Sequence, residues 1–218
     1  MWKFDENVFQ KNLETFGRGS LREILVRPDR NRERWEILSS KEGSPTLLWD
    51  NTSLHSRYDP VTEGERWADA AMASFDNPSQ GFLVMGLGLG YHLFSLLERF
   101  QGQVVLFEPI PDILRASFRL FPWYLFSDRL SFFTDPSGTR GLSRGYAVLS
   151  HAPSEKLRPD LYRSVRKIYE GGGVSLELPA PGPRHFTPLR RILPHCPLGL
   201  SLPDPNGTPG QLLRCRRL

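Results

Sequence analysis

The sequence predicts an α/β fold in which a parallel sheet carries helices on both faces. The first observation is the stretch 81–109, where an apolar run of strand length is followed by three glycines at alternate positions and by apolar residues at helical spacing. The second is that three more short apolar runs follow along the chain. Apolar runs without polar alternation suit strands that are covered on both faces, as the strands of a parallel sheet are.

The stretch 81–109 is typical of a Rossmann-like βαβ unit, which binds nucleotide-type ligands. Its glycines permit a sharp turn and the close approach of a ligand, and the following helix N-terminus offers free N–H groups. An acid ends the second strand, where the ribose-binding acid of such a unit lies. The expected ligand-binding residues are the three glycines, the first two helical residues and this acid: Gly86, Gly88, Gly90, Tyr91, His92 and Glu108.

The glycine spacing favours a ligand without a pyrophosphate. The pattern is G-x-G-x-G, whereas the dinucleotide pattern G-x-G-x-x-G would need a glycine where the chain has Tyr91. This spacing is common in methyltransferases that use S-adenosylmethionine (SAM). Such enzymes often carry an acid two residues before the first glycine, and that position holds Val84. Two interpretations stay open: a site for SAM or another nucleotide-type ligand, and a glycine turn that only packs a helix on a strand.

A small N-terminal α/β unit is expected over residues 1–53, before a Rossmann-like domain at 54–170. Residues 5–16 place apolar side chains on one side of a helix. Short apolar pieces at 21–26, 35–38 and 46–49 are separated by charges and turns, which favours strands.

A helix is also expected from position 60, before the first strand of the Rossmann-like domain. Asp59 is a good N-cap, and Pro60 suits the first helical position because proline has no N–H to leave unpaired there. Capping explains Asp59 but not the neighbouring Tyr58. We therefore also treat Tyr58 and Asp59 as candidates for a substrate-binding or accessory role.

After the central unit we expect a helix at 111–120 and strands at 130–133 and 146–149. Asp135, just beyond the third strand, is a candidate to contact an adenine amino group, and it equally suits an ordinary turn. His151 follows the fourth strand, at the sheet edge where ligands bind in open α/β folds. It is a candidate hydrogen-bonding residue or base toward a substrate, and the alternative is a solvated loop histidine.

Residues 171–218 predict an irregular tail. They hold nine of the 19 prolines and seven glycines, without a periodic apolar segment. Such a stretch cannot bury enough apolar area to offset its ordering entropy. The abrupt change of composition also resembles translation in a shifted frame, a hypothesis that an intact reading frame around codons 165–180 would contradict. His185, His195 and Cys196 lack the spacing of a zinc site, so we expect no metal.

Charge and composition exclude several classes of protein. The tail holds six arginines and two acids, while the rest of the chain holds 22 basic and 22 acidic residues, so the folded body is neutral. Without a basic stripe, a nucleic-acid partner is not expected. No apolar stretch reaches the roughly 18 residues of a membrane helix, and the start does not resemble a signal peptide. With its two cysteines confined to the tail, the chain suits the cytoplasm.

The chain resembles the N-terminal part of the motility accessory factor (Maf) family, bacterial proteins tied to flagellin glycosylation with nonulosonic acids. The resemblance rests on four segments: LHSRYDPVTEGERW (54–67), VMGLGLGYHL (84–93), FEPIPDIL (107–114) and SHAP…LRPDLY (150–162). In that family a Rossmann-like region precedes a larger domain that is thought to carry transfer. The resemblance implies flagellin, or the rest of such a glycosyltransferase, as partner, and it implies that this chain is a truncated or frame-shifted member.

Two functions follow as alternatives. In the first, the chain is a non-catalytic accessory domain that supports folding, carrier recognition or homo-oligomerisation; Val84, and the lack of an Asn/Asp-Pro-Pro-Tyr motif after the fourth strand, favour it. In the second, it is a small SAM-dependent methyltransferase, with the glycines at the methionine part, Glu108 at the ribose and Asp135 at the adenine. A third interpretation is that the crevice at the carboxyl edge of the Rossmann-like sheet binds a nucleotide-sugar donor.

Overall fold

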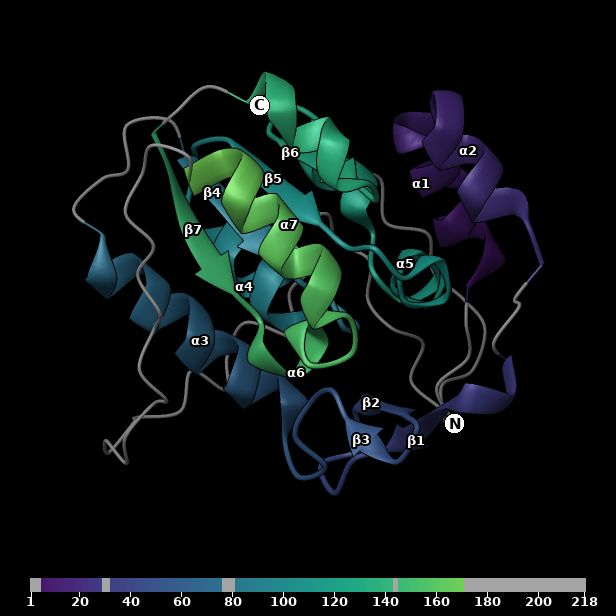
Figure 1. Cartoon of the computed structure of the whole chain (residues 1–218). Helices are drawn as coiled ribbons and strands as arrows, with labels where there is room; N and C mark the ends of the chain where they lie inside the picture. The colour runs from purple at the N-terminus through teal and green to yellow at the C-terminus, as the bar shows by residue number, and fades with distance from the viewer. Residues whose placement is uncertain (1–4, 29–31, 76–80, 143–144, 171–218) are drawn as a thin grey trace, which may run out of the picture. The chain divides into compact units, whose positions relative to one another are not determined.

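Four parallel strands form the central sheet of the protein, as the sequence predicted (Figure 1). The computed structural model describes residues 5–28, 32–75, 81–142 and 145–170. The strands are β4 (Gly81–Met85), β5 (Val104–Phe107), β6 (Leu130–Phe133) and β7 (Tyr146–Ser150). Every residue of β4 and β5 is buried, as expected of strands that are covered on both faces.

The strand order creates one point where the chain changes direction across the sheet. The order is β6-β5-β4-β7, with β4 paired to β5 on one side and to β7 on the other. The chain therefore moves outward from β4 to β6 and then crosses back to place β7 beside β4. In open α/β sheets, ligands bind outside the carboxyl ends of the strands at such a reversal. A site is accordingly expected where β4 and β7 end.

Helices cover both faces of the sheet, which confirms the predicted architecture. They are α3 (Pro60–Ser74), α4 (Tyr91–Arg99), α5 (Pro111–Leu120), the short α6 (Ala152–Glu155) and α7 (Pro159–Glu170). Phe82 and Val84 of β4 belong to the core cluster that α3, α4 and α5 share. Leu83 and Met85, which point to the other face, pack with Tyr162 of α7, the helix that crosses the sheet in Figure 1.

Two helices and a three-stranded antiparallel sheet precede the central sheet. They are α1 (Glu6–Phe16), α2 (Gly19–Val26), β1 (Trp35–Ser39), β2 (Pro45–Trp49) and β3 (Thr52–Ser53). The prediction of a strand over 21–26 is wrong. Leu21 and Leu25 lie one helical turn apart, so a helix brings both of them against the hydrophobic core. Short 3₁₀ helices lie at Arg32–Arg34, Trp123–Phe126 and Pro136–Gly141.

The predicted start of α3 is confirmed. Asp59 is the N-cap, and its carboxylate accepts a hydrogen bond from the Thr62 backbone N–H at 3.0 Å. Pro60 is the first helical residue, and Glu63 lies in the first turn, where the helix dipole favours an acid. This capped helix end fixes the preceding loop, which carries residues 54–58.

One hydrophobic core contains side chains from both sides of the predicted boundary at 53/54. Phe9, Leu25 and Leu47 belong to the same buried cluster as Phe82 and Leu114. The boundary itself stays a prediction, and the predicted tail at 171–218, with its histidines and cysteines, lies outside the described residues. Within the described ranges, no helix is long and apolar enough to cross a membrane.

Candidate functional site

The glycine loop joins β4 to α4 at the carboxyl edge of the sheet. Gly86, Gly88 and Gly90 have φ angles of 94°, 51° and 107°, a region that residues with a Cβ rarely adopt. Leu87 and Leu89 between them are fully buried. The alternating glycines therefore supply the backbone turn that the sequence predicted.

The chain's own side chains pack against two of these glycines. A Cβ on Gly86 would lie 2.5 Å from the Cβ of Ser154 in α6, and one on Gly88 would lie 2.4 Å from Nε2 of His55. These approaches are shorter than real contacts allow, so the two glycines are needed for side chains of this protein to come close. Residues from the loop before α3 and from α6 thus take the space beside the turn.

The third glycine contacts a buried tryptophan. A Cβ on Gly90 would lie 2.5 Å from Cζ2 of Trp123, which is fully buried. The indole N–H of Trp123 donates to the Ser117 hydroxyl at 3.1 Å, and that hydroxyl donates to the Leu89 carbonyl at 2.8 Å. This chain of hydrogen bonds ties the glycine loop to α5 and to the segment that follows it.

Glu108 faces the glycine loop from the end of β5. It is fully buried, and its two carboxylate oxygens accept hydrogen bonds from the backbone N–H groups of Leu87, at 2.9 Å, and of Ile110, at 3.0 Å. Burial raises the pKa of Glu108 to about 7, although the two backbone N–H groups lower it. The acid predicted to hold a ribose thus joins the loop after β4 to the loop after β5.

Three buried histidines meet at the carboxyl ends of β4 and β7. His55, His92 and His151 have exposed fractions of 4%, 2% and 6%, and one ring nitrogen from each lies within 4.8 Å of the others. The rings of His92 and His151 are stacked, with centroids 4.3 Å apart and planes inclined by 6°. The centroid of His55 lies 5.1 Å from that of His151. The cluster stands where the strand order places a site.

His92 has one satisfied and one unsatisfied ring nitrogen. Its Nε2 lies 3.0 Å from the Gly86 carbonyl oxygen, which can only accept, so Nε2 carries the proton. Its Nδ1 is therefore a lone-pair acceptor, and it has no hydrogen-bond partner among the described residues. A buried polar atom without a partner costs free energy and calls for an explanation.

The other two histidines make several polar contacts. Nε2 of His55 accepts from the Leu89 backbone N–H at 2.6 Å, and its Nδ1 lies 3.8 Å from the carboxylate of Glu63. Nδ1 of His151 lies 2.7 Å from the hydroxyl of Ser154. Each ring is thus held by at least one partner on its own side of the cluster.

The stacked pair of histidines is uncharged at neutral pH. Burial, with a smaller contribution from the neighbouring His55, lowers the pKa of His92 to about 3. Burial also lowers the pKa of His151 well below its ordinary value, and a hydrogen bond to the Leu54 backbone only partly opposes this shift. A neutral imidazole keeps one ring lone pair, which can accept a hydrogen bond or bind a metal.

Several predicted site residues lie elsewhere or have structural partners. The Tyr91 hydroxyl donates to the Pro45 carbonyl at 2.8 Å, and burial raises the pKa of this tyrosine. Tyr58 is 57% exposed, with the Lys41 ammonium 4.7 Å above its ring. Asp135 follows β6, which β5 separates from β4, and it caps a 3₁₀ helix by accepting from the Ser137 N–H at 2.8 Å.

The structure brings His92 and His151 together with a residue that the sequence analysis did not single out, His55. His92 and His151 follow strands that end at this edge of the sheet, whereas His55 lies in a loop and has no such signal. No sequence spacing connects them, since they come from the loop before α3, the first turn of α4 and the loop after β7.

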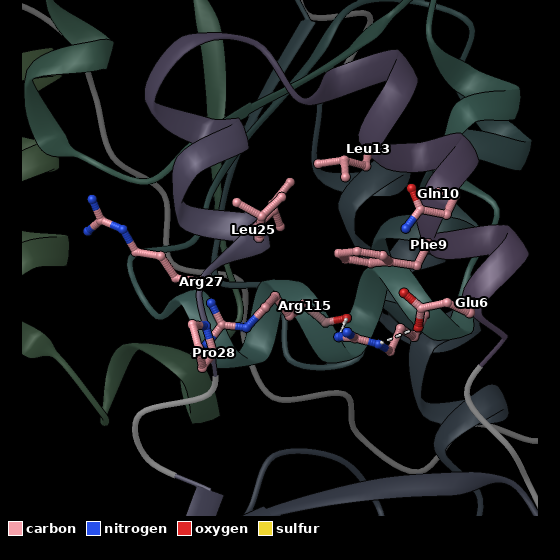
Figure 2. A pocket seen from close by; sticks show the side chains of 10 residues that line it. Glu6, Phe9, Gln10, Leu13, Leu25, Arg27, Pro28 and Arg115 are labelled. Atoms are coloured by element: carbon pink, nitrogen blue, oxygen red, sulfur yellow. Dashed lines mark hydrogen bonds and ion pairs between the residues drawn. The ribbon is translucent and has the colours of Figure 1, made fainter.

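A separate cavity of about 360 Å³ lies between α1, α2 and α5 (Figure 2). Phe9 and Leu13 line it from α1 and Leu25 from α2, while Arg115 lines it from α5. The Arg115 guanidinium forms an ion pair with Asp112 and donates to the Ile24 carbonyl at 2.8 Å. None of the predicted site residues lines this cavity, so it is distinct from the edge of β4 and β7.

Comparison with known proteins identifies the family. Residues 1–134 match the model of the glycosyltransferase Maf N-terminal domain, and no curated protein sequence matches the chain. Among solved structures, the Maf glycosyltransferase from Magnetospirillum magneticum AMB-1 is similar with a TM-score of 0.50 and 14% identity. The match covers 75% of this chain and 35% of that one, and at this identity it shows the fold alone. Because the family model spans more than half of the sequence, the chain belongs to the Maf glycosyltransferase N-terminal domain family.

Proposed function

We propose that this chain is the accessory domain of a Maf-type glycosyltransferase that modifies flagellin, and that it does not itself catalyse transfer. Membership of the Maf N-terminal domain family supports the link to a glycosyltransferase. The link to flagellin rests on the resemblance of four sequence segments to that family. Its role is to bind or position the rest of the enzyme or its flagellin acceptor.

The packing of the glycine loop supports the proposal that the chain does not itself catalyse transfer. In a ligand-binding Rossmann domain, the glycines leave room for the ligand to approach the backbone. Here His55 and Ser154 stand at contact distance from Gly88 and Gly86. Glu108 uses both carboxylate oxygens on backbone N–H groups. A nucleotide-type ligand would have to displace these groups and leave buried donors without acceptors.

The alternative is a SAM-dependent methyltransferase, which the glycine spacing and the strand order favour. It requires His55 and the Ser154 region to move away from the glycine loop when SAM binds. The cost of breaking the hydrogen bond between His55 and the Leu89 N–H opposes that movement.

Calorimetry on the full chain separates these functions. We expect no binding heat with S-adenosylhomocysteine or with a CMP-activated sugar. Micromolar binding of S-adenosylhomocysteine that Gly88→Ala abolishes would establish the methyltransferase instead. Binding of the CMP-sugar alone would indicate a donor site within this domain. Gly19→Ala is the matched control, since Gly19 has the same φ of 51° but no atom within 4 Å of its Cβ position.

The proposed contact with flagellin, or with the rest of the enzyme, needs a separate measurement. We expect immobilised full chain to retain purified flagellin, or a separately expressed Maf transferase domain, in a surface-binding assay. Tyr58→Ala tests whether the exposed tyrosine contributes to that contact, and Leu125→Ala, at a second exposed apolar side chain, is its control. Failure to retain either partner would remove the accessory role.

A further inference from the structure

We propose that His55, His92 and His151 form a binding site for a divalent transition-metal ion of the zinc class. The ion would lie at the carboxyl edge between β4 and β7. It would join three segments that are distant along the chain: the loop before α3, the first turn of α4 and the loop after β7. Imidazole nitrogen suits zinc, copper, nickel and iron rather than magnesium or calcium.

The distances suit three ligands to one ion. One nitrogen from each ring lies within 4.8 Å of the others. Zinc–nitrogen bonds of about 2.1 Å in tetrahedral geometry place ligand atoms roughly 3.4 Å apart. The ligand nitrogens therefore need to approach one another by up to about 1.4 Å, and one member of the stacked pair needs to turn so that both lone pairs point to a common centre.

The unsatisfied nitrogen of His92 points to a ligand rather than to packing alone. Its Nε2 is fixed by the Gly86 carbonyl, so the lone pair of Nδ1 is buried without a partner in the described part of the chain. Metal-binding histidines typically donate their other ring N–H to a backbone carbonyl or carboxylate, which fixes the tautomer. His92 already has this arrangement, and a bound cation would satisfy Nδ1.

The other two histidines have comparable outer partners. The Glu63 carboxylate lies 3.8 Å from Nδ1 of His55, and the Ser154 hydroxyl lies 2.7 Å from Nδ1 of His151. Nδ1 of each ring thus faces a polar side chain, which leaves Nε2 as the nitrogen to bind the metal. Binding would replace the bond that His55 Nε2 accepts from the Leu89 N–H, and the His151 ring also makes a hydrogen bond with the Leu54 backbone, so the ion competes with existing hydrogen bonds.

Charge also favours a cation. Glu63 brings a negative charge to the third histidine, and its side chain is 44% exposed. This partly exposed carboxylate therefore stands beside the buried His55.

The composition of the chain permits a clean experiment. It has five histidines and two cysteines, so four competing ligands lie in the tail: His185, His195, Cys196 and Cys215. We would change the two tail histidines to Gln and the two cysteines to Ser in the full chain. Zn²⁺ is then titrated by calorimetry, and Co²⁺ is titrated by its visible absorption, which reports nitrogen coordination.

We expect one equivalent of Zn²⁺ to bind in this background and to raise its melting temperature. His92→Gln keeps a donor for the Gly86 carbonyl but removes the Nδ1 lone pair, and it should weaken binding by well over tenfold. Glu63→Gln should weaken binding by about tenfold without changing the stoichiometry. Glu98→Gln, the same charge change at an exposed position of α4, should leave the affinity unchanged.

Two results would overturn the site. One is the absence of Zn²⁺ binding in the background that retains only His55, His92 and His151. The other is binding whose affinity His92→Gln does not alter. If His92→Gln fails to fold by circular dichroism, His55→Gln and Glu63→Gln decide by the same titration, because neither changes the bond to the Gly86 carbonyl.

Discussion

A single buried carboxylate, Glu108, determines how the loops after β4 and β5 fit together. It is predicted from the sequence as a ribose ligand, and the structure surrounds it with the N–H groups of Leu87 and Ile110. The same residue type at the same position can serve either purpose. The difference lies in whether the side chain turns toward the backbone or toward a ligand.

Glu108→Ala is expected to lower the free energy of unfolding by roughly 2–4 kcal/mol, because two buried N–H donors lose their acceptor. Urea denaturation followed by circular dichroism measures the loss. Glu108→Gln, which retains one carbonyl acceptor, should lose less. If Glu108→Ala leaves stability unchanged but abolishes the binding of a ligand, Glu108 belongs to a ligand site after all.

Buried His92 makes stability depend on pH. Burial lowers the pKa of His92 to about 3, below the roughly 6.5 of an unfolded histidine. The unfolded chain then binds the proton more readily, so the contribution of His92 is complete above about pH 6.5 and is lost as the pH falls toward 3. A pKa difference of one between the folded and the unfolded chain corresponds to about 1.4 kcal/mol of stability.

The pKa shift of Glu108 makes stability depend on pH in the opposite direction. Its pKa is raised from 4.5 to about 7, so its contribution is present below pH 4.5 and is lost as the pH rises through 7. The two effects offset each other between about pH 4.5 and 6.5. Urea midpoints across roughly pH 3 to 8 should therefore fall most steeply below about pH 4.5. His92→Gln should make that fall shallower, and an identical profile for variant and wild type would contradict the assignment.

At the scale of the element, two constraints determine the glycine loop between β4 and α4: the backbone turn and the close packing of side chains against it. Gly88→Ala should destabilise the protein by about 2 kcal/mol more than Gly19→Ala. Both positions have a φ of 51°, but only at Gly88 would the new Cβ meet a side chain, that of His55. Chemical denaturation of the two variants measures the difference. Equal losses would mean that backbone strain alone explains the glycine.

The sequence was sufficient for the elements whose signals are local. The apolar runs predicted β4 to β7, and Pro60 and Pro111 marked the starts of α3 and α5. The short piece 21–26 was mistaken for a strand, because so short a mixture of apolar and polar residues fits either period and only tertiary packing decides. The strand order could not be read from any single run.

The site was harder to predict than the fold. His92 and His151 were found from their places after strands β4 and β7. His55 was missed because its contact with Leu89 spans 34 positions of the chain. The direction of the Glu108 side chain, and the neighbours of each glycine, depend on side chains from other elements. Such contacts leave no periodic trace in the sequence.

At the scale of the whole molecule, Asn12 joins the N-terminal helix to the rest of the fold. Its amide donates to the Phe118 and Phe121 carbonyls, both at 2.8 Å, and its carbonyl accepts from the Tyr124 N–H at 2.8 Å. The residue is fully buried. These bonds make α1 part of the same packed body as α5, despite its place before the predicted boundary at 53/54.

Asn12→Ala should therefore destabilise the protein by roughly 3 kcal/mol, because one buried and two partly buried backbone groups lose their partner. It should do so in one cooperative unfolding transition, which differential scanning calorimetry detects. Asn7→Ala, on the exposed side of α1, should change stability by less than about 0.5 kcal/mol. Two separate transitions, with only the first affected, would instead mark residues 1–53 as an independent unit.

The position of β7 beside β4 has a consequence for synthesis on the ribosome. β4, β5 and β6 are translated first, and until residues 146–150 emerge one edge of the wholly apolar β4 has no neighbour. Unpaired apolar edges are sites of aggregation in nascent chains. The strand that closes this edge also leads into His151, which stacks on His92, so we expect the histidine cluster to assemble when the sheet is completed.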